Sequence, residues 1–293
     1  MSKQVKADIL LLLITAIWGI SFPLMRNVID NIPMSTYLLM RFLIASIVLI
    51  IVFYKKLKQI TLESIIYSLV LGIMLFGTLF FTVKALYYTT ASNVAFITGL
   101  SIVIVPIISA IYLKKKPDSF AIVGVVLSLS GLYFLSGGVN YQFNIGDLFT
   151  LIGAFCASMQ IIFIDKFTNK NDPILLGVLQ ISWGSILYFL LCVGTGLEVV
   201  ILNPSIIITV FVTGILGTAL AFTAQTAIQK FTSPVHTVLI FTLEPVFGVL
   251  FSILIPKTNG QKELITMNIA IGCILILGGM LLSEMKRILG TLK

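Results

Sequence analysis

Charged residues are scarce in this chain. Only 10% of its 293 residues are Asp, Glu, Lys or Arg, whereas 58% are hydrophobic, and the mean hydropathy is +1.12. Soluble domains carry roughly a quarter charged residues. The composition therefore excludes an ordinary soluble protein.

The residues that carry enzymatic and nucleotide chemistry are also few. A single histidine and no HExxH sequence leave no catalytic zinc site of that kind. No GxxxxGK[ST] loop is present, which argues against ATP-driven transport within this chain. No apolar run holds paired carboxylates, which weighs against intramembrane aspartyl proteolysis. Cys156, Cys192 and Cys273 have no metal-ligand spacing and are interpreted as packing residues. We expect neither an enzyme nor a cofactor or metal.

Long apolar runs fill most of the chain instead. A helix needs about 20 predominantly apolar residues to cross a bilayer. The first run has no small-residue cleavage site, so we expect a membrane helix rather than a signal peptide. The sequence predicts an all-α polytopic membrane protein with ten transmembrane helices, at about 8–29, 34–54, 64–87, 91–113, 119–137, 145–164, 174–194, 204–227, 234–255 and 264–285.

The net charge of +8 could suggest a nucleic-acid partner, but the distribution of the basic residues indicates a membrane instead. With ten helices and a cytoplasmic N-terminus, the inner loops hold 14 of the 19 lysines and arginines. This asymmetry is the positive-inside rule. It predicts that both termini are cytoplasmic, in a bacterial-type inner membrane, and that the chain binds no nucleic acid.

The chain contains a weak internal repeat. Similar segments recur in the same order in both halves: ADILLLLITAIW (7–18) and GDLFTLIGAFCA (146–157), FGTLFF (76–81) and LGTALA (216–221), SLSGLYFLS (128–136) and LILGGMLLS (275–283). We expect one five-helix repeat in residues 1–140 and a second in 141–293. Because five is odd, the second repeat starts on the opposite side of the membrane, so the two are inverted. Transporters built this way bind substrate near the midplane between the repeats and work by alternating access.

The stretches TTASNVAFITGLSIVIVPIIS (89–109) and GTALAFTAQTAIQKFTSPVHTVLIFTLEPVFGVLF (217–251) closely resemble EamA-type members of the drug/metabolite transporter superfamily. AIWGISFP (16–23) and YLLMRFLIA (37–45) look similar at the start of the chain. The resemblance covers essentially the whole sequence. It implies a ten-helix transporter that usually exports, but members carry amino acids, nucleosides, drugs and other small metabolites. One departure is His236, in a region where the family often has arginine.

Glu244 and Pro245 stand together near the middle of the ninth expected helix. A carboxylate at that depth costs a few kcal/mol, so it should face protein or water rather than lipid. Pro245 cannot donate to the carbonyl of Phe241, which predicts a helix break. A proton-binding glutamate would suit a proton-coupled carrier. The alternative is a purely structural residue that pairs with a buried cation or a helix end.

Lys84 lies toward the outer end of the third expected helix. Gly77, Phe81, Lys84 and Tyr88 follow at spacings of 4, 3 and 4, so they share one helical stripe. A cation between aromatic side chains suits a substrate carboxylate. The alternative is a lysine whose amine reaches the outer interface.

Arg41 lies seven residues into the second expected helix, roughly 10 Å deep. Its counterpart in the second repeat, within one residue, is Gln180. Arginine can bind a carboxylate or phosphate bidentately. Snorkelling or a structural pair with a helix end is the alternative.

Aromatic and amide side chains complete the predicted substrate path. Trp18 and Phe22 are one turn apart on the first expected helix, and Trp183 shares a face with Gln180 on the seventh. Trp18 is near mid-span, where a cavity wall is plausible, although aromatic stripes are commonly packing. Gln160 could bind substrate or another helix. His236 is either a titratable gate or a solvated helix-end residue.

We therefore expect a secondary-active exporter of small metabolites such as amino acids. Its central cavity would be framed by helices one to four and six to nine. The fifth and tenth helices would pack at the periphery or at a dimer contact, so the protein would be a monomer or homodimer in the lipid bilayer. The main alternative is a flippase for a lipid or lipid-linked substrate, and a passive channel is disfavoured because no filter-like loop is present.

Overall fold

The structure is a computed structural model that describes residues 3–26, 28, 31–85, 87–89, 91–114, 117–135, 144–196, 203–255 and 266–291. In these residues all regular structure is helical. The helices are α1 (Lys3–Arg26), α2 (Met34–Val52), α3 (Tyr54–Leu57), α4 (Leu62–Ala85), α5 (Ala91–Gly99), α6 (Ser101–Tyr112), α7 (Ser119–Leu135), α8 (Ile145–Phe167), α9 (Pro173–Thr195), α10 (Pro204–Gly214), the π-helix η1 (Ile215–Leu220), α11 (Ala221–Ile228), the 3₁₀-helix η2 (Gln229–Phe231), α12 (Pro234–Phe241), α13 (Glu244–Leu254) and α14 (Met267–Thr291).

Seven of the helical segments in the described residues are long and apolar enough to cross a membrane. Three shorter apolar helices, Phe96–Tyr112, Ser119–Leu135 and Met267–Ser283, lie among them. The chain is therefore an all-helical membrane protein, as the sequence predicts.

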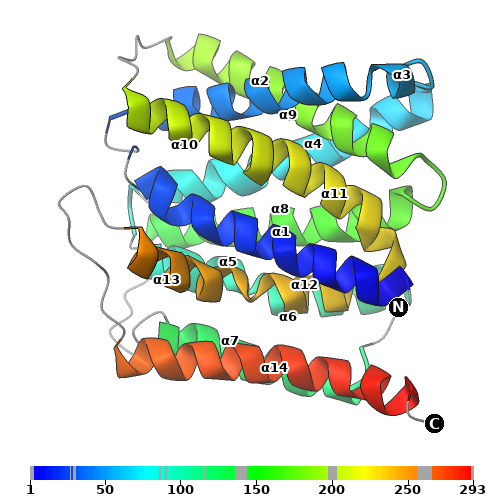
Figure 1. Ribbon diagram of the computed structural model, residues 1–293, viewed down its shortest axis with the longest axis vertical. Helices are drawn as coiled ribbons and strands as arrows, with labels where there is room; N and C mark the ends of the chain where they lie inside the picture. The colour runs from blue at the N-terminus through cyan, green and yellow to red at the C-terminus, as the bar shows by residue number, and fades with distance from the viewer. Residues whose placement is uncertain are drawn as a thin grey trace.

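The helices lie side by side and roughly parallel or antiparallel to one another (Figure 1). The pair α7 and α14 forms one edge of the molecule, and α2 and α9 lie at the opposite edge. The start of α1 and the end of α14 lie at the same end of the bundle. We call this the termini end; the short helix α3 also lies there.

Several helices begin where a polar side chain caps them and a proline follows. Asp172, Asn203 and Ser233 each accept a backbone N–H of the first turn, and each is followed directly by proline. Proline is favoured there because its missing N–H would have no partner in the first turn. Helix α8 instead begins with a capping box, in which Asn144 and Asp147 bind each other's backbone N–H groups. The sequence therefore sets these starts locally.

Two of the seven long membrane crossings are interrupted near their middle, and the shorter α5–α6 segment is interrupted at Leu100. The crossing from α10 to α11 passes through the six-residue π-helix η1. The crossing from α12 to α13 breaks at Thr242 and Leu243, just before Glu244 and Pro245. π-Helices and helix breaks change the backbone hydrogen-bond pattern and are frequent at functional sites.

Glycines let α7 and α14 approach closely. A Cβ on Gly124 would lie 2.7 Å from the carbonyl oxygen of Gly279, and one on Gly131 would lie 2.6 Å from that of Gly272. Moving seven residues forward along α7 corresponds to moving seven residues back along α14, so the two helices pack antiparallel. Small residues are the usual means of close helix contact in membranes, where lipid gives no hydrophobic drive for association.

Gly279 and its neighbour Gly278 provide a matched pair of test positions. A Cβ on Gly279 would lie 2.5 Å from Ser128 Oγ and 2.7 Å from the Gly124 carbonyl, whereas one on Gly278 meets nothing within 4 Å. Gly279→Ala should therefore lower the stability by about 1–3 kcal/mol through overpacking. Gly278→Ala should be neutral or stabilising by up to about 1 kcal/mol, because alanine favours helix. Thermal unfolding of the purified protein checks this, and equal effects of the two substitutions would contradict the close contact.

An ion pair joins two loops at the termini end. Lys56 Nζ pairs with Asp172 Oδ2, while Asp172 Oδ1 accepts the backbone N–H groups of Ile174 and Leu175 at 2.9 and 3.0 Å. Partial burial raises the pKa of Asp172, but the Lys56 ammonium and these two N–H groups outweigh it and hold the pKa below its usual range. The pair links the chain after α2 to the start of α9.

The lowered pKa of Asp172 predicts a pH-dependent contribution to stability. The contribution is complete above the unfolded-state pKa and is lost as the pH falls through the native pKa. Asp172→Asn keeps a capping side chain, so at neutral pH it should cost only the partly exposed ion pair, about 0.2–1 kcal/mol. The difference from wild type should vanish at acid pH. Unfolding measured across pH tests this, with Lys56→Met expected to show the same effect, non-additive with Asp172→Asn.

Candidate functional site

Arg41 is the centre of a buried polar cluster. Its side chain, on α2, is only 5% exposed. Nε donates to Thr218 Oγ1 at 2.6 Å, and Nη2 donates weakly to the Gly217 carbonyl at 3.4 Å. One turn earlier on α2, the Tyr37 hydroxyl donates to Thr213 Oγ1 at 2.9 Å. The guanidinium is therefore fixed from one side by the crossing that contains η1.

The π-helix η1 supplies the acceptors that hold this cluster together. The Gly217 carbonyl accepts from Trp18 Nε1 at 2.9 Å as well as from Arg41. Thr218 accepts from Arg41 and donates to the Thr213 carbonyl at 3.0 Å, five residues back. Helices α1 and α2 thus both bind the interrupted crossing at Gly217, and α2 also binds it at Thr218.

The guanidinium of Arg41 has hydrogen-bonding capacity to spare. Arginine carries five N–H donors. In the described part of the chain, Arg41 donates only two of these N–H groups, the one on Nε and one of the two on Nη2. Both N–H groups of Nη1 and one of Nη2 are left for another acceptor. One N–H of Nη1 lies parallel to the free N–H of Nη2, and such a parallel pair suits a carboxylate.

Glu244 lies at the first turn of α13, directly after the break that ends α12. Arg41 is the charged group that acts electrostatically on its carboxyl group. The two side chains do not form a direct ion pair, and no hydrogen bond from the described residues engages Glu244. The site thus brings together a buried cation and an acidic group without letting them neutralise each other by contact.

Trp18 forms an aromatic cluster beside these charges. Its ring centroid is 4.9 Å from that of Phe222 on α11 and 5.0 Å from that of Phe241 at the end of α12. Trp18 itself is 9% exposed. Three separate helices therefore meet in one aromatic contact next to Gly217.

Lys84 lies in a second cluster, away from Arg41. Its Nζ is 5.4 Å from the ring centre of Phe80 and 5.0 Å from that of Phe149 on α8. Phe81 and Tyr88 also pack on Phe149, with ring centroids 6.1 and 5.7 Å away. The predicted stripe of Lys84, Phe81 and Tyr88 thus converges on one ring of α8, as a cation–π cluster.

Gln160 and Gln180 form a third group between α8, α9 and α11. Gln160 Nε2 donates to Gln180 Oε1 at 3.2 Å, and Gln180 Nε2 donates to Thr226 Oγ1 at 2.8 Å. Trp183, on the same helix as Gln180, packs against Gly72 of α4. The side chain of Phe22 lies outside the described residues. The ten predicted substrate-path residues are thus divided among three clusters, with Phe22 unassigned.

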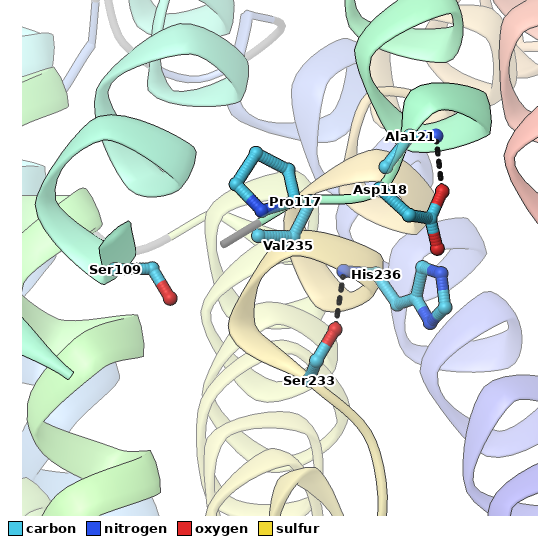
Figure 2. A pocket seen from close by; sticks show the side chains of 7 residues that line it. All are labelled: Ser109, Pro117, Asp118, Ala121, Ser233, Val235 and His236. Carbon is cyan, nitrogen blue, oxygen red and sulfur yellow. Dashed lines mark hydrogen bonds between the residues drawn. The ribbon is translucent and has the colours of Figure 1, made fainter. Parts of the chain in front are cut away.

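His236 lines a small pocket of about 80 Å³ at the junction of α6, α7 and α12 (Figure 2). Its backbone N–H donates to Ser233 Oγ at 3.2 Å, and Asp118 accepts the backbone N–H of Ala121 at 2.9 Å. These contacts cap α12 and α7. The pocket is lined by Ser109, Pro117, Asp118, Ala121, Ser233, Val235 and His236.

The sequence reading missed Thr218, Phe222 and Phe241. Nothing in ILGTAL (215–220) distinguishes a π-helix from an α-helix. The one available signal was a threonine next to glycine in the middle of an apolar run. In the described residues no group of three or more His, Cys, Asp or Glu side chains is arranged to hold a metal ion, and the three cysteines are free.

Comparison with known proteins identifies the family. The model of the EamA-like transporter family matches residues 5–137 and 144–285. An uncharacterized transporter of Archaeoglobus fulgidus is 31% identical over 257 residues, covering 86% of this chain and 78% of the relative. An uncharacterized transporter of Haemophilus influenzae is 26% identical, over 60% of this chain and 64% of that protein.

A solved structure shares the fold across nearly the whole chain. A crystal structure whose title names no function superposes with a TM-score of 0.77 at 19% identity, covering 95% of this chain and 98% of the other. The resemblance inferred from residues 89–109 and 217–251 is thereby confirmed. This chain belongs to the EamA-like transporter family.

Proposed function

We propose that the chain is a secondary-active transporter that exports small metabolites such as amino acids by alternating access. Ten transmembrane helices would form two inverted five-helix repeats, residues 1–140 and 141–293. Both termini would lie on the cytoplasmic side of an inner membrane, and substrate would bind near the midplane between the repeats. The observation on which the proposal depends is that Arg41 acts electrostatically on Glu244 while it is hydrogen-bonded to Thr218 and Gly217 and forms no ion pair with the carboxyl group.

Equivalent contacts in the two halves support the inverted repeat. A Cβ on Gly72 of α4 would lie 3.0 Å from the Gln180 carbonyl, and one on Gly214 of α10 would lie 3.1 Å from the Arg41 carbonyl. In the sequence repeat Gly72 and Gly214 fall at corresponding places in the third and eighth expected helices, and Arg41 corresponds to Gln180 within one residue. The same close approach therefore occurs twice. In one contact the glycine belongs to the first half and the carbonyl to the second, and in the other contact these are exchanged, as a two-fold axis in the membrane plane requires.

The contact between α7 and α14 supports the same symmetry. A shift of 148 positions carries Gly124 onto Gly272 and Gly131 onto Gly279 (272 − 124 and 279 − 131). Exchanging the two helices by that shift turns the contact of Gly124 with Gly279 into the contact of Gly272 with Gly131. The interface between α7 and α14 is therefore self-complementary. The two ranges that match the family, 5–137 and 144–285, divide the chain at the proposed boundary.

The chemistry of the central cluster suits a zwitterion. The free N–H groups of Arg41 can bind a carboxylate bidentately, and the Glu244 carboxylate can accept an ammonium group. Because Arg41 and Glu244 are not in contact, a solute that carries both charges can bridge them without first breaking an ion pair. The aromatic rings of Trp18, Phe222 and Phe241 exclude water beside it, which strengthens both interactions.

Lys84 fits the outer part of the same route. The residue lies near the end of α4 opposite the termini end, and its amine rests on Phe80 and Phe149. An anionic group leaving the central site would meet this cation next. The lipid bilayer and the transported solute are the partners of the proposal, and the protein would act as a monomer or homodimer.

Counterflow in proteoliposomes tests the proposed substrate class. Vesicles are loaded with one unlabelled amino acid at a time, and entry of its labelled form is measured. We expect one or a few amino acids to drive uptake, and Arg41→Gln to raise KM by at least about tenfold, since hydrogen bonds to charged groups contribute about 1.5–3 kcal/mol. Ser46→Ala is the control on the same helix, because Ser46 contacts only Ser182 of α9 by its hydroxyl and should keep KM.

Absence of counterflow across the whole amino-acid panel, with protein shown to be correctly inserted, would overturn the amino-acid proposal. The same vesicles would then be tested with nucleosides, cationic drugs and a fluorescent lipid. Lipid movement between leaflets would identify the flippase alternative.

Glu244→Gln separates proton coupling from a structural role. The amide keeps the size and hydrogen-bonding groups of the side chain but cannot bind or release a proton. If Glu244 couples transport to protons, the variant should fold normally and still exchange solute, while uptake driven by a pH gradient is lost. Transport is measured with and without an imposed gradient. Unchanged coupling in Glu244→Gln would assign Glu244 a structural role.

A further inference from the structure

Helix α11 and the turn after it carry an unusually polar buried face. Four of its side chains have exposures of 6% or less: Thr223, Gln225, Thr226 and Gln229. They lie in the half of the α10–α11 crossing that runs toward the termini end, since Thr209 near the start of that crossing contacts Leu24 near the end of α1. Polar side chains in the membrane interior normally satisfy one another or mark a solute path.

Two of these residues, Thr223 and Gln225, have a buried side-chain oxygen without a hydrogen-bond partner among the described residues, and the carboxamide of Gln225 has the longer reach. Gln225 is 1% exposed, and its Nε2 donates to Gln229 Oε1 at 3.2 Å, but its Oε1 accepts no hydrogen bond. Gln229 is fully engaged, because its Nε2 donates to the Ile161 carbonyl at 2.6 Å. A buried acceptor without a donor is destabilising, and inside a bilayer no bulk water relieves that cost. Such an atom calls for a partner outside the chain.

Gln225 lies one turn beyond the aromatic cluster. Phe222 is three residues earlier on α11, so the two side chains share a side of the helix about 4.5 Å apart along its axis. Phe222 packs on Trp18, which packs on Phe241 and binds the Gly217 carbonyl. The order along this crossing is therefore the Arg41 contact at Gly217 and Thr218, then the aromatic rings, then Gln225.

We propose that Gln225 is a second binding position for the transported solute, on the termini side of an aromatic partition formed by Trp18, Phe222 and Phe241. Its carboxamide oxygen accepts an N–H or O–H group of the solute before the rings separate and admit it to Arg41 and Glu244. The position is uncharged, so it binds polar donors weakly and releases them easily, as an entry site requires. The inference rests on the proposed transport function.

Cysteine labelling tests water access to this position without any substrate. Cys156, Cys192 and Cys273 are first replaced by alanine, and Gln225→Cys is then treated with a membrane-impermeant cationic thiosulfonate from each side. Leu220→Cys is the control, since Leu220 lies on the same crossing but is 48% exposed on the outside of the bundle, where lipid would cover it. We expect Gln225→Cys to react from the termini side several-fold faster than Leu220→Cys. Equal rates, or reaction only from the opposite side, would overturn the proposal.

Transport kinetics provide the second test. Gln225→Met removes the unused acceptor, so it should raise KM several-fold for the amino acid active in counterflow. It also removes the N–H group that Gln229 Oε1 accepts, so one unpartnered acceptor replaces another and the melting temperature should change little. Gln229→Met removes amide atoms already bound to protein, so it should lower the melting temperature and leave KM unchanged. If Gln225→Met raises the melting temperature and leaves KM unchanged, the unused acceptor is only a packing defect and the proposal is wrong. If no amino acid is transported, the labelling result still decides access to Gln225.

Discussion

Backbone hydrogen bonding inside the membrane is the constraint on which this structure depends. A crossing that departs from the α-helix must find other partners for its polar groups, because hydrocarbon offers none. In the α10–α11 crossing those partners come from neighbouring helices: Trp18 and Arg41 both donate to the Gly217 carbonyl. The irregular turn therefore needs α1 and α2 beside it. The same contacts also give Arg41 a fixed position in the interior.

A buried cation and a partly buried acidic group placed near each other would ordinarily pair. Here Arg41 is bound instead by the neutral acceptors Thr218 and Gly217, and Glu244 follows a helix break on a different crossing. Removing both charges from water costs several kcal/mol per ion, and direct contact does not recover that cost here. Charged groups that remain in a membrane interior at this cost commonly mark a ligand-binding site or a solute path. This reasoning supports Arg41 and Glu244 as the centre of the site more strongly than either residue does alone.

Glycine contacts bring some pairs of helices in the bundle closer together than others. The helices α7 and α14 meet backbone to backbone at two places and form one edge of the molecule, apart from the polar clusters. Gly72 and Gly214 bring α4 and α10 against the backbone of Gln180 and Arg41. A one-carbon change at such contacts moves whole helices, so they fix where the charged side chains lie.

The sequence by itself determined the class of the protein and much of its order along the chain. Apolar runs of membrane length and the family resemblance are properties of the sequence, and the structure and comparisons bear them out. The capping residues before Pro173, Pro204 and Pro234 are also local, since each acts within its own helix start. Arg41, Glu244 and Trp18 stood out because charged and bulky polar groups are costly at mid-membrane.

Only the tertiary structure decided which of these residues lie together. Lys84 and Glu244 were equal candidates by composition, yet Lys84 rests on Phe149 while Glu244 is influenced by Arg41. The roles of Thr218, Phe222 and Gln225 also depend on contacts with other helices. A helical period gives the face on which a side chain lies. It does not give the neighbour across that face, because helix packing is chosen by contacts between segments far apart in the chain.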